Sequence, residues 1–257
     1  RVSIGSVTLI ILMIVARRGL QFSRRVWVML VFAGVFFSLD LFFWHRSIIY
    51  IGPGLATLLA NFQVFIMMIA GLLLLKQRPT GIQLVAVPLA LVGLAMIVGL
   101  DWRSLPDDYR LGVIFGLLTA LAYASYMLTL RSARLNASEP LPLCEVAVVS
   151  VLCTVLLAAS AAAEGVSLAV PDVRDLGWLI CYGVLSHSIG WLFLANALPH
   201  VSTTEAGLAL LLQPTLSFVW DIAFFGRPMQ PVEIAGAALA LGAIYIGSRK
   251  SSLQNRL

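Results

Sequence analysis

The sequence predicts an all-α polytopic membrane protein. Three observations support that fold class: an apolar composition, a series of long apolar stretches, and an internal repeat. Hydrophobic residues make up 60% of the chain and charged residues 11%, whereas soluble domains hold roughly 45–50% and about 25%. A soluble fold of this length would leave too much hydrocarbon in water. We therefore expect most of the surface to face lipid.

About nine apolar stretches are predicted to be transmembrane helices, because a helix of about 20 apolar residues spans the hydrocarbon layer with its backbone polar groups paired. In chain order they cover residues 2–16, 26–46, 53–75, 80–100, 111–131, 142–163, 176–198, 203–225 and 231–248. Charged and turn residues separate them. These interruptions include ARRGLQFSRR at 16–25, GPG at 52–54, KQRPT at 76–80, DWRSLPDDYR at 101–110, LNASEPLP at 135–142 and FGRPMQP at 225–231.

The basic residues orient the predicted helices, because cytoplasmic loops are enriched in Lys and Arg. If the C-terminal tail is cytoplasmic and each stretch reverses direction, eleven basic residues lie inside and five outside. The outer five are Arg46, Arg103, Arg110, Arg174 and Arg227. We therefore expect a multi-pass protein of the bacterial inner (cytoplasmic) membrane with a cytoplasmic C-terminus. The net charge of +5 reflects this topology and does not indicate a nucleic-acid partner.

The N-terminal stretch is not typical of a signal peptide. Arg17 and Arg18 follow the apolar residues instead of preceding them, and no small-residue cleavage site is present. Nine crossings would place Arg1 outside the cell, and Arg1 is not an initiator methionine. We therefore expect that a helix preceding residue 1 is missing.

An internal repeat relates the two halves of the chain. LATLLANFQVF at 55–65 aligns with EAGLALLLQPT at 205–215 at an offset of 150 residues. After a one-residue gap the alignment continues at an offset of 149, which pairs Gly93 with Gly242. The offset corresponds to five helices, so the second copy is expected to be inverted in the membrane. Inverted repeats are typical of secondary transporters, which bind substrate near mid-membrane between the copies.

Three segments resemble the EamA-type transporters of the drug/metabolite transporter (DMT) superfamily. They are DLFFWHRSIIYIGPGLATLLANFQVF at 40–65 with KQRPT following, GVIFGLLTALAYASYMLTLRS at 112–132, and TTEAGLALLLQPTLSFVWDIAFFGRPMQPVEIAGAALALGAIYIG at 203–247. One departure is that Gln77-Arg78 and Gly226-Arg227 stand where the family commonly has Glu-Arg. This departure puts any salt bridge of these loops in doubt.

The resemblance implies a ten-helix, inverted-repeat (5+5) transporter that lacks its first helix here. The first EamA-like repeat would occupy residues 1–100 as helices 2–5, and the second would occupy residues 111–248 as helices 6–10. Residues 249–257 would form a basic cytoplasmic tail. By analogy with the family, the expected activity is export of a small amino-acid-like or drug-like metabolite.

Polar and aromatic side chains inside the predicted helices are the candidate substrate pathway, because burying such groups in lipid is costly and often functional. Gln213, Ser217 and Asp221 recur every four residues and so share one helix face. The full candidate set is Asp40, Trp44, Thr57, Asn61, Gln63, Tyr123, Tyr126, His187, Trp191, Gln213, Ser217 and Asp221. Pro88 and Pro214 interrupt backbone hydrogen bonding and are candidate hinges.

The amide and indole candidates also have purely structural interpretations. Asn61, Gln63 and Gln213 could serve as hydrogen-bond links between helices instead of contacting a ligand. Trp44 and Trp191 could anchor the protein at the membrane interface instead of lining a cavity. Both alternatives stay open from the sequence.

The ionisable candidates also have more than one interpretation. Asp40 and Asp221 could lie in a water-exposed mouth or pair with Arg46 and Arg227, instead of binding substrate or protons. His187 could be a hydrogen-bonded core residue or a proton relay, since an imidazole titrates near neutral pH. Proton antiport through Asp40, Asp221 or His187 is therefore one hypothesis for energy coupling.

Other chemistry has little support in the sequence. Cys144, Cys153 and Cys181 lack metal or redox spacing, and no nucleotide-binding or zinc-protease motif occurs. We expect no catalytic residues, no cofactor and no metal.

The predicted function is a secondary transporter, monomeric or homodimeric, whose partners are a small-molecule substrate, membrane lipid and, as a candidate coupling ion, the proton. The alternatives are a membrane-embedded lipid-modifying enzyme, with His187 beside Ser186 or Ser188, and a non-transporting scaffold subunit.

Overall fold

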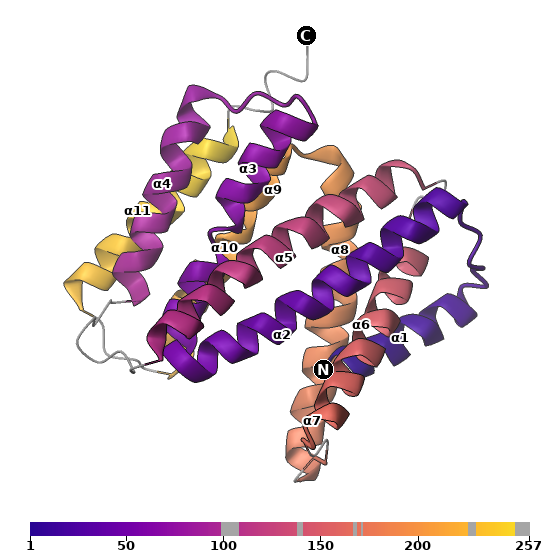
Figure 1. Ribbon diagram of the computed structural model, residues 1–257. Helices are drawn as coiled ribbons and strands as arrows, with labels where there is room; N and C mark the ends of the chain where they lie inside the picture. Colours follow the sequence, from indigo (N-terminus) through magenta and orange to yellow (C-terminus); the bar gives the residue numbers. More distant parts are fainter. Residues whose placement is uncertain (99–107, 138–140, 167–168, 171, 226–229, 250–257) are drawn as a thin grey trace. The chain divides into compact units, whose positions relative to one another are not determined.

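The computed structural model describes residues 1–98, 108–137, 141–166, 169–170, 172–225 and 230–249, without the side chains of residues 97, 98, 217, 218, 220–222, 224, 225, 248 and 249. Its described residues form helices and no strands (Figure 1). The helices are α1 (Val2–Val15), α2 (Arg24–Ala60), α3 (Gln63–Leu74), α4 (Gly81–Val98), α5 (Tyr109–Leu135), α6 (Leu143–Ala163), α7 (Val173–Tyr182), the π-helix η1 (Gly183–Gly190), α8 (Trp191–Ala197), the 3₁₀-helix η2 (Leu198–His200), α9 (Thr203–Leu210), α10 (Leu212–Phe225) and α11 (Pro231–Arg249).

Four helical segments in the described part of the chain are long and apolar enough to cross a membrane. They are Arg24–Leu74, Tyr109–Leu135, Leu143–Ala163 and Val173–His200. Shorter apolar helices cover Val2–Val15, Gly81–Met96 and Pro231–Gly247. The all-α, multi-pass membrane class predicted from composition is therefore confirmed.

The break expected at residues 52–54 is present, since α2 (Arg24–Ala60) comprises two helical segments that meet in a kink at a non-helical Gly52. Gly52 has φ 78° and ψ 163°, a positive φ that glycine adopts without steric cost. Pro53 has no N–H to donate to the carbonyl of the residue four positions earlier, which favours the same kink. The second of these segments ends at Ala60, and a further interruption at Asn61 and Phe62 divides the helix predicted over residues 53–75.

A second helix is also interrupted where the sequence predicted continuity. Residues 203–225 form α9 and α10, which are separated at Leu211. The N–H of Leu211 donates to the carbonyl of Leu208, and the N–H of Phe62 donates to the carbonyl of Leu59. At both interruptions the hydrogen bond therefore joins residues three apart, as in a 3₁₀-helix, instead of four apart. The two interruptions lie within one residue of equivalent positions in the predicted repeat.

The chain divides into two compact units, and neither is continuous in sequence. Unit 1 comprises Arg1–Phe42 and Ser125–His200, and unit 2 comprises Phe43–Ala124 and Val201–Leu257. Each unit therefore contains residues from both predicted repeats. α2 and α5 each contribute residues to both units.

In unit 1, α1 packs against α6 and η1 through small and polar residues. The hydroxyls of Ser6 and Thr154 lie 2.9 Å apart, and Ser188 Oγ donates to the carbonyl of Gly5 at 3.1 Å. A Cβ atom on Gly5 would lie only 2.4 Å from Cδ2 of His187. Glycine at this position therefore allows α1 to approach the histidine closely.

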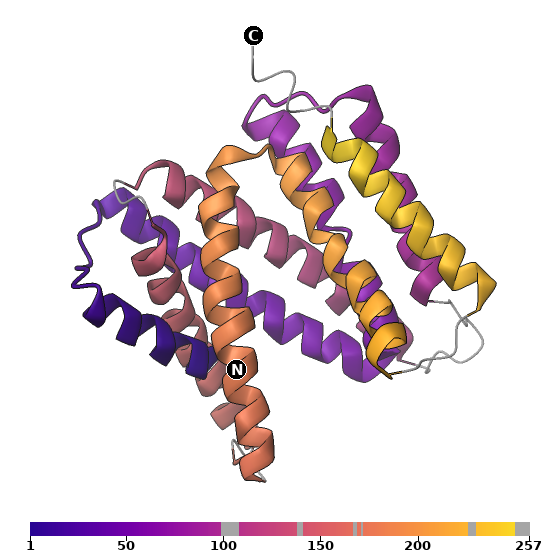
Figure 2. The ribbon, with the colours of Figure 1, turned by 180° about the vertical axis from the view of Figure 1, so that it is seen from behind.

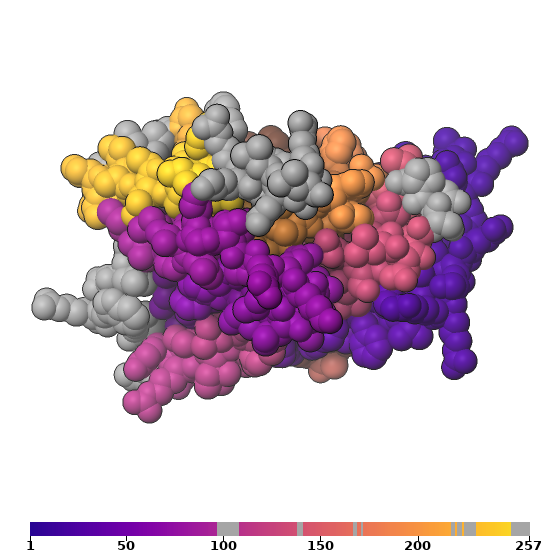
Figure 3. Space-filling model, turned by 90° about the horizontal axis from the view of Figure 1, so that it is seen from above, coloured from indigo at the N-terminus to yellow at the C-terminus, as the bar shows by residue number. Residues whose placement is uncertain are grey.

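In unit 2, α4 and α11 lie side by side and run antiparallel (Figures 1 and 2). Near the middle of the pair, a Cβ on Gly93 would lie 2.6 Å from the backbone of Gly236 and Ala240. The end of α11 meets the start of α4, since a Cβ on Gly247 would lie 2.9 Å from that of Ala86. The yellow atoms of α11 directly adjoin the purple region that includes α4 in the space-filling view (Figure 3).

The core of unit 2 also joins α3 and α9. Val64, Leu94, Leu208 and Ile244 belong to one buried cluster. At the end of the α3–α9 contact, Gln77 Oε1 accepts hydrogen bonds from the backbone N–H of Thr203 at 3.1 Å and from its hydroxyl at 3.0 Å. A side-chain hydrogen bond thus links the residues after α3 to the first turn of α9.

Candidate functional site

Asp40 is a buried carboxylate on an apolar helix of unit 1. Its side chain is 8% exposed, and no hydrogen bond or ion pair to its carboxylate occurs among the described residues. Of the alternatives considered from the sequence, the structure shows neither an exposed position for Asp40 nor a pair with Arg46. A carboxylate inside a membrane-spanning helix costs roughly 2.5–3.5 kcal/mol on insertion scales and usually marks a functional position.

Four rings from four elements meet in unit 1, and we call them the aromatic cluster: Phe37 of α2, Tyr126 of α5, His187 of η1 and Trp191 of α8. Phe37 stacks on Tyr126 at a centroid distance of 4.6 Å and on His187 at 5.8 Å. Trp191 meets Phe37 and Tyr126 edge to face, each at 5.1 Å. Such aromatic contacts fix the relative positions of the helices that carry them.

Three members of the aromatic cluster are sequence-predicted candidates, and Phe37 is not. His187 and Trp191 are four residues apart, whereas Tyr126 lies far from them in the sequence, and the fold brings all three together around Phe37. The sequence does carry a signal for Phe37, since it precedes Asp40 by three residues and so shares a helix face with it.

His187 has a hydrogen-bond partner that sequence reasoning also missed. Its Nε2 lies 3.0 Å from Oγ of Ser150, and both side chains are buried. Thr154 Oγ1 donates to the carbonyl of Ser150, so the polar contact continues along α6. The signal available was the spacing of Ser150 and Thr154, which places both on one face of the helix at 142–163.

His187 also lies within a π-helix. Residues Gly183–Gly190 form η1 between α7 and α8. Ser188 Oγ donates to the carbonyls of Gly183 and Gly5 at 3.2 and 3.1 Å, which fastens this turn to α1. π-helical turns are rare and frequently occur at functional sites.

The candidates of the first predicted repeat in unit 2 differ in burial. Asn61 and Gln63 are buried, and Trp44 and Thr57 are half-buried. Asn61 Nδ2 donates to the carbonyl of Thr57 at 2.7 Å, so this donor bonds its own helix and does not link two helices. The Oε1 atom of Gln63 is buried and has no hydrogen-bond partner within the described part of the chain.

The remaining candidates are placed as follows. Tyr123 is half-buried, and Gln213 is exposed near the start of α10. Ser217 and Asp221 belong to α10, but their side chains lie outside the described residues. Pro88 lies within α4, and Pro214 follows the interruption at Leu211.

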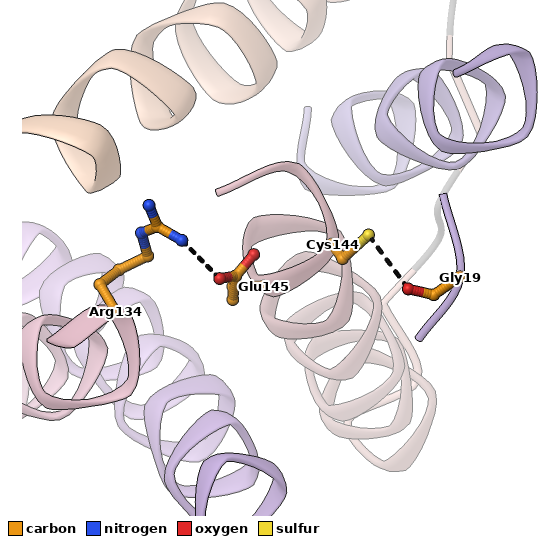
Figure 4. Close-up of polar contacts among 4 residues, drawn as sticks. All are labelled: Gly19, Arg134, Cys144 and Glu145. Atoms are coloured by element: carbon orange, nitrogen blue, oxygen red, sulfur yellow. Dashed lines mark hydrogen bonds and ion pairs between the residues drawn. The ribbon is translucent and has the colours of Figure 1, made fainter. Parts of the chain in front are cut away.

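A buried ion pair was not anticipated. Nη1 of Arg134, near the end of α5, lies 2.6 Å from Oε1 of Glu145, and the two side chains are 6% and 0% exposed. Figure 4 shows Glu145 and its neighbour Cys144 pointing in different directions from the start of α6: Glu145 toward Arg134, and Cys144 toward the carbonyl of Gly19 at 3.7 Å. Arg134 is one of the eleven basic residues that the charge count places on the cytoplasmic side, and no sequence pattern links it to Glu145.

No group of three or more His, Cys, Asp or Glu side chains that could hold a metal ion occurs among the residues that the structure describes. Cys144 and Cys153 are buried, Cys181 is exposed, and these three cysteines form no disulfide. The prominent polar features of unit 1 are therefore an unpaired carboxylate, an aromatic cluster with a hydrogen-bonded histidine, and one buried ion pair.

Comparison with solved structures supports the fold alone. A crystal structure of a protein that is 17% identical superposes with a TM-score of 0.80, and the match covers 96% of this chain and 86% of that protein. At this identity the likeness carries no information on substrate.

Comparison with curated proteins identifies exporters as relatives. The chain is 25% and 26% identical to the pseudopaline exporter CntI from two strains of Pseudomonas aeruginosa. Both alignments cover 94% of this chain and 82% of the relative. The EamA-like transporter family model matches residues 1–99 and 110–249. The resemblance noted in the sequence is thus confirmed, and the chain belongs to the EamA-like transporter family.

Proposed function

We propose that this chain is a secondary transporter that exports a small metabolite across the bacterial inner membrane by alternating access. The observation that carries the proposal is the buried, unpaired carboxylate of Asp40, three residues from Phe37 of the aromatic cluster, in a chain of a transporter family. Intramembrane ionisable groups typically mark substrate or ion pathways. The name of the CntI relatives, pseudopaline exporter, supports export as the direction.

Contacts between helix ends support a topology of nine alternating crossings. Ser47 Oγ donates to the carbonyl of Gly112 at 2.8 Å, and both residues belong to ends that this topology places outside. Arg131 Nε donates to the carbonyl of Leu198 at 3.1 Å, and both belong to ends that it places inside. These contacts fit a chain that reverses direction at every predicted loop.

Packing within unit 2 supports an inverted repeat. α4 and α11 close the first and second predicted repeats, and they run antiparallel. A same-direction duplication would favour a parallel arrangement of equivalent helices. The family model also matches in two stretches, residues 1–99 and 110–249, close to the predicted repeats at 1–100 and 111–248. On this proposal residues 249–257 form a cytoplasmic basic tail.

The surroundings of His187 do not favour the alternative of a membrane-embedded lipid-modifying enzyme. The hydroxyl of Ser188 bonds two backbone carbonyls, and Ser186 is exposed. Neither serine is hydrogen-bonded to His187 as a nucleophile is to its base. We therefore propose a transporter without catalytic residues or cofactor, driven by an ion gradient or by the gradient of its substrate.

Topology can be tested by cysteine labelling. In a chain whose Cys144, Cys153 and Cys181 are replaced by serine or alanine, single cysteines at Arg78 and Arg227 are labelled with an impermeant maleimide in intact cells. Labelling of residue 227 but not of residue 78 is expected. Equal labelling of both would contradict the inverted repeat and, with it, this form of alternating access.

Transport itself is tested in proteoliposomes. We expect the purified protein to release a preloaded small metabolite, with pseudopaline as the first compound tested because of the CntI relatives. Protein-free liposomes and liposomes with an unrelated membrane protein are the controls. If a broad set of metabolites, including pseudopaline, shows no flux from correctly inserted protein, the scaffold alternative is favoured.

A further inference from the structure

We propose that Asp40 and the aromatic cluster form a subsite for a cationic group of the substrate, a protonated amine being the chemical class that fits. This inference rests on the proposed transport function and specifies its ligand. It starts from the Asp40 carboxylate, which is 8% exposed and without an ion pair among the described residues. A desolvated carboxylate of this kind is strongly stabilised by a cation that it can contact directly.

The aromatic cluster supplies the second part of the subsite. Phe37 and Asp40 are three residues apart on α2, so they share the helix face on which Phe37 contacts Tyr126, His187 and Trp191. Trp191 is half-buried, unlike Phe37 and Tyr126. Indole and phenol rings attract cations through their electron-rich faces, and that attraction strengthens away from water. A carboxylate beside such rings favours an ammonium over a neutral or anionic group.

Arg1 is a cation whose field reaches Asp40, but its guanidinium is engaged elsewhere. Arg1 precedes the first residue of α1, and its guanidinium hydrogen-bonds Tyr182 Oη and lies 5.1 Å over the ring of the same residue. Cys153 of α6 is a further titratable neighbour of Asp40, and His187 is hydrogen-bonded to Ser150. Arg1 therefore leaves the carboxylate without a direct counter-ion, and its positive field opposes binding of a cation.

This arrangement makes two substitutions act in opposite directions. Asp40→Asn keeps the size of the side chain and removes its charge, so it should weaken the binding of a cation. Arg1→Gln removes the opposing positive field and should strengthen binding. A structural role for Asp40 would not produce opposite effects on the affinity for a cation.

The test uses three probes of similar shape: phenethylamine, which is cationic at neutral pH, 2-phenylethanol, which is neutral, and phenylacetate, which is anionic. Binding to the purified full chain in detergent is measured by calorimetry. We expect the wild-type protein to bind the amine about tenfold or more tightly than either other probe. Asp40→Asn should abolish that preference, Asp40→Glu should retain part of it, and Arg1→Gln should increase it. The control, Asp175→Asn in the exposed first turn of α7, should leave it unchanged.

Two results would overturn the subsite: equal binding of the three probes by the wild-type protein, or an unchanged amine preference in a folded Asp40→Asn variant. Thermal unfolding establishes whether each variant is folded. If Asp40→Asn does not fold, the amine preference is measured in Asp40→Glu instead. If Asp40→Asn removes only a pH dependence of flux and keeps the amine preference, Asp40 binds a proton and the proposal fails. Flux in proteoliposomes is measured separately. Transport by a protein that shows no amine preference would reject this inference alone. An amine preference in a protein that shows no flux would reject the transport function.

Discussion

Arg134 Nη1 donates to Glu145 Oε1 across 2.6 Å, between two side chains that are almost completely buried. The second carboxylate oxygen of Glu145, Oε2, has no hydrogen-bond partner among the described residues. Removing one member of such a pair leaves the other charge buried without its ion-pair partner, which typically costs about 3–5 kcal/mol. We therefore expect Glu145→Ala to lower the unfolding temperature of the detergent-purified protein strongly.

The double variant Arg134→Met with Glu145→Leu is the informative control. Because it removes both charges and keeps apolar volume, its stability should lie near that of the wild-type protein. Equal losses in the single and double variants would mean that the ion pair is not the reason for the effect.

The predicted repeat pairs Gly93 with Gly242, and the structure places them in different surroundings. A Cβ on Gly93 would lie 2.6 Å from the backbone of α11, whereas nothing lies within 4 Å of a Cβ on Gly242. Backbone atoms cannot move aside as a flexible side chain can, so Gly93→Ala should destabilise the protein by about 1–3 kcal/mol. Gly242→Ala should be neutral or slightly stabilising, and thermal unfolding of the two variants compares them directly.

Gln77 Oε1 accepts two hydrogen bonds from Thr203 at the start of α9. Helix N-termini favour negative charge, because their N–H groups carry partial positive charge. Gln77→Glu should therefore maintain or raise stability, by about 0.3–1 kcal/mol, and Gln77→Ala should lower it by about 1 kcal/mol. Gln21→Ala, at an exposed position before α2, is the control for loss of a glutamine side chain. A stabilising effect of Gln77→Ala would contradict this assignment.

The hydrogen bond between His187 and Ser150 is expected to contribute to the stability of the protein. Ser150→Ala leaves Nε2 of the buried histidine without its hydroxyl partner, at a cost of about 1–3 kcal/mol. Ser160→Ala, which removes from the same helix a hydroxyl whose bond to Glu164 Oε1 is long, at 3.4 Å, and solvent-exposed, should have little effect. The unfolding temperatures of both variants test this difference, and equal values would exclude an energetic role for the Ser150 contact.

The candidate site was only partly predictable. Polar and aromatic residues stand out in apolar helices, so Asp40, Tyr126, His187 and Trp191 could be selected as candidates on their separate predicted helices, with His187 and Trp191 on the same one. This selection missed Phe37, Ser150 and Glu145, since phenylalanine and serine are ordinary constituents of membrane helices and Glu145 follows a loop directly. The repeat indicated that Gln63 and Gln213 are equivalent, but not that one is buried and the other exposed.

The sequence by itself determined the membrane class, the approximate positions of the helices and the family, because each follows from local composition, short-range periodicity or order along the chain. Tertiary structure decided which helices pack together: residues from both predicted repeats contribute to each compact unit, and four rings from four elements meet at Phe37. The physical reason is that in lipid nearly every helix face is apolar, so hydrophobicity does not distinguish the face that meets protein from the face that meets lipid. Close packing at glycines, as at Gly5 and Gly93, and a few polar contacts make that choice instead.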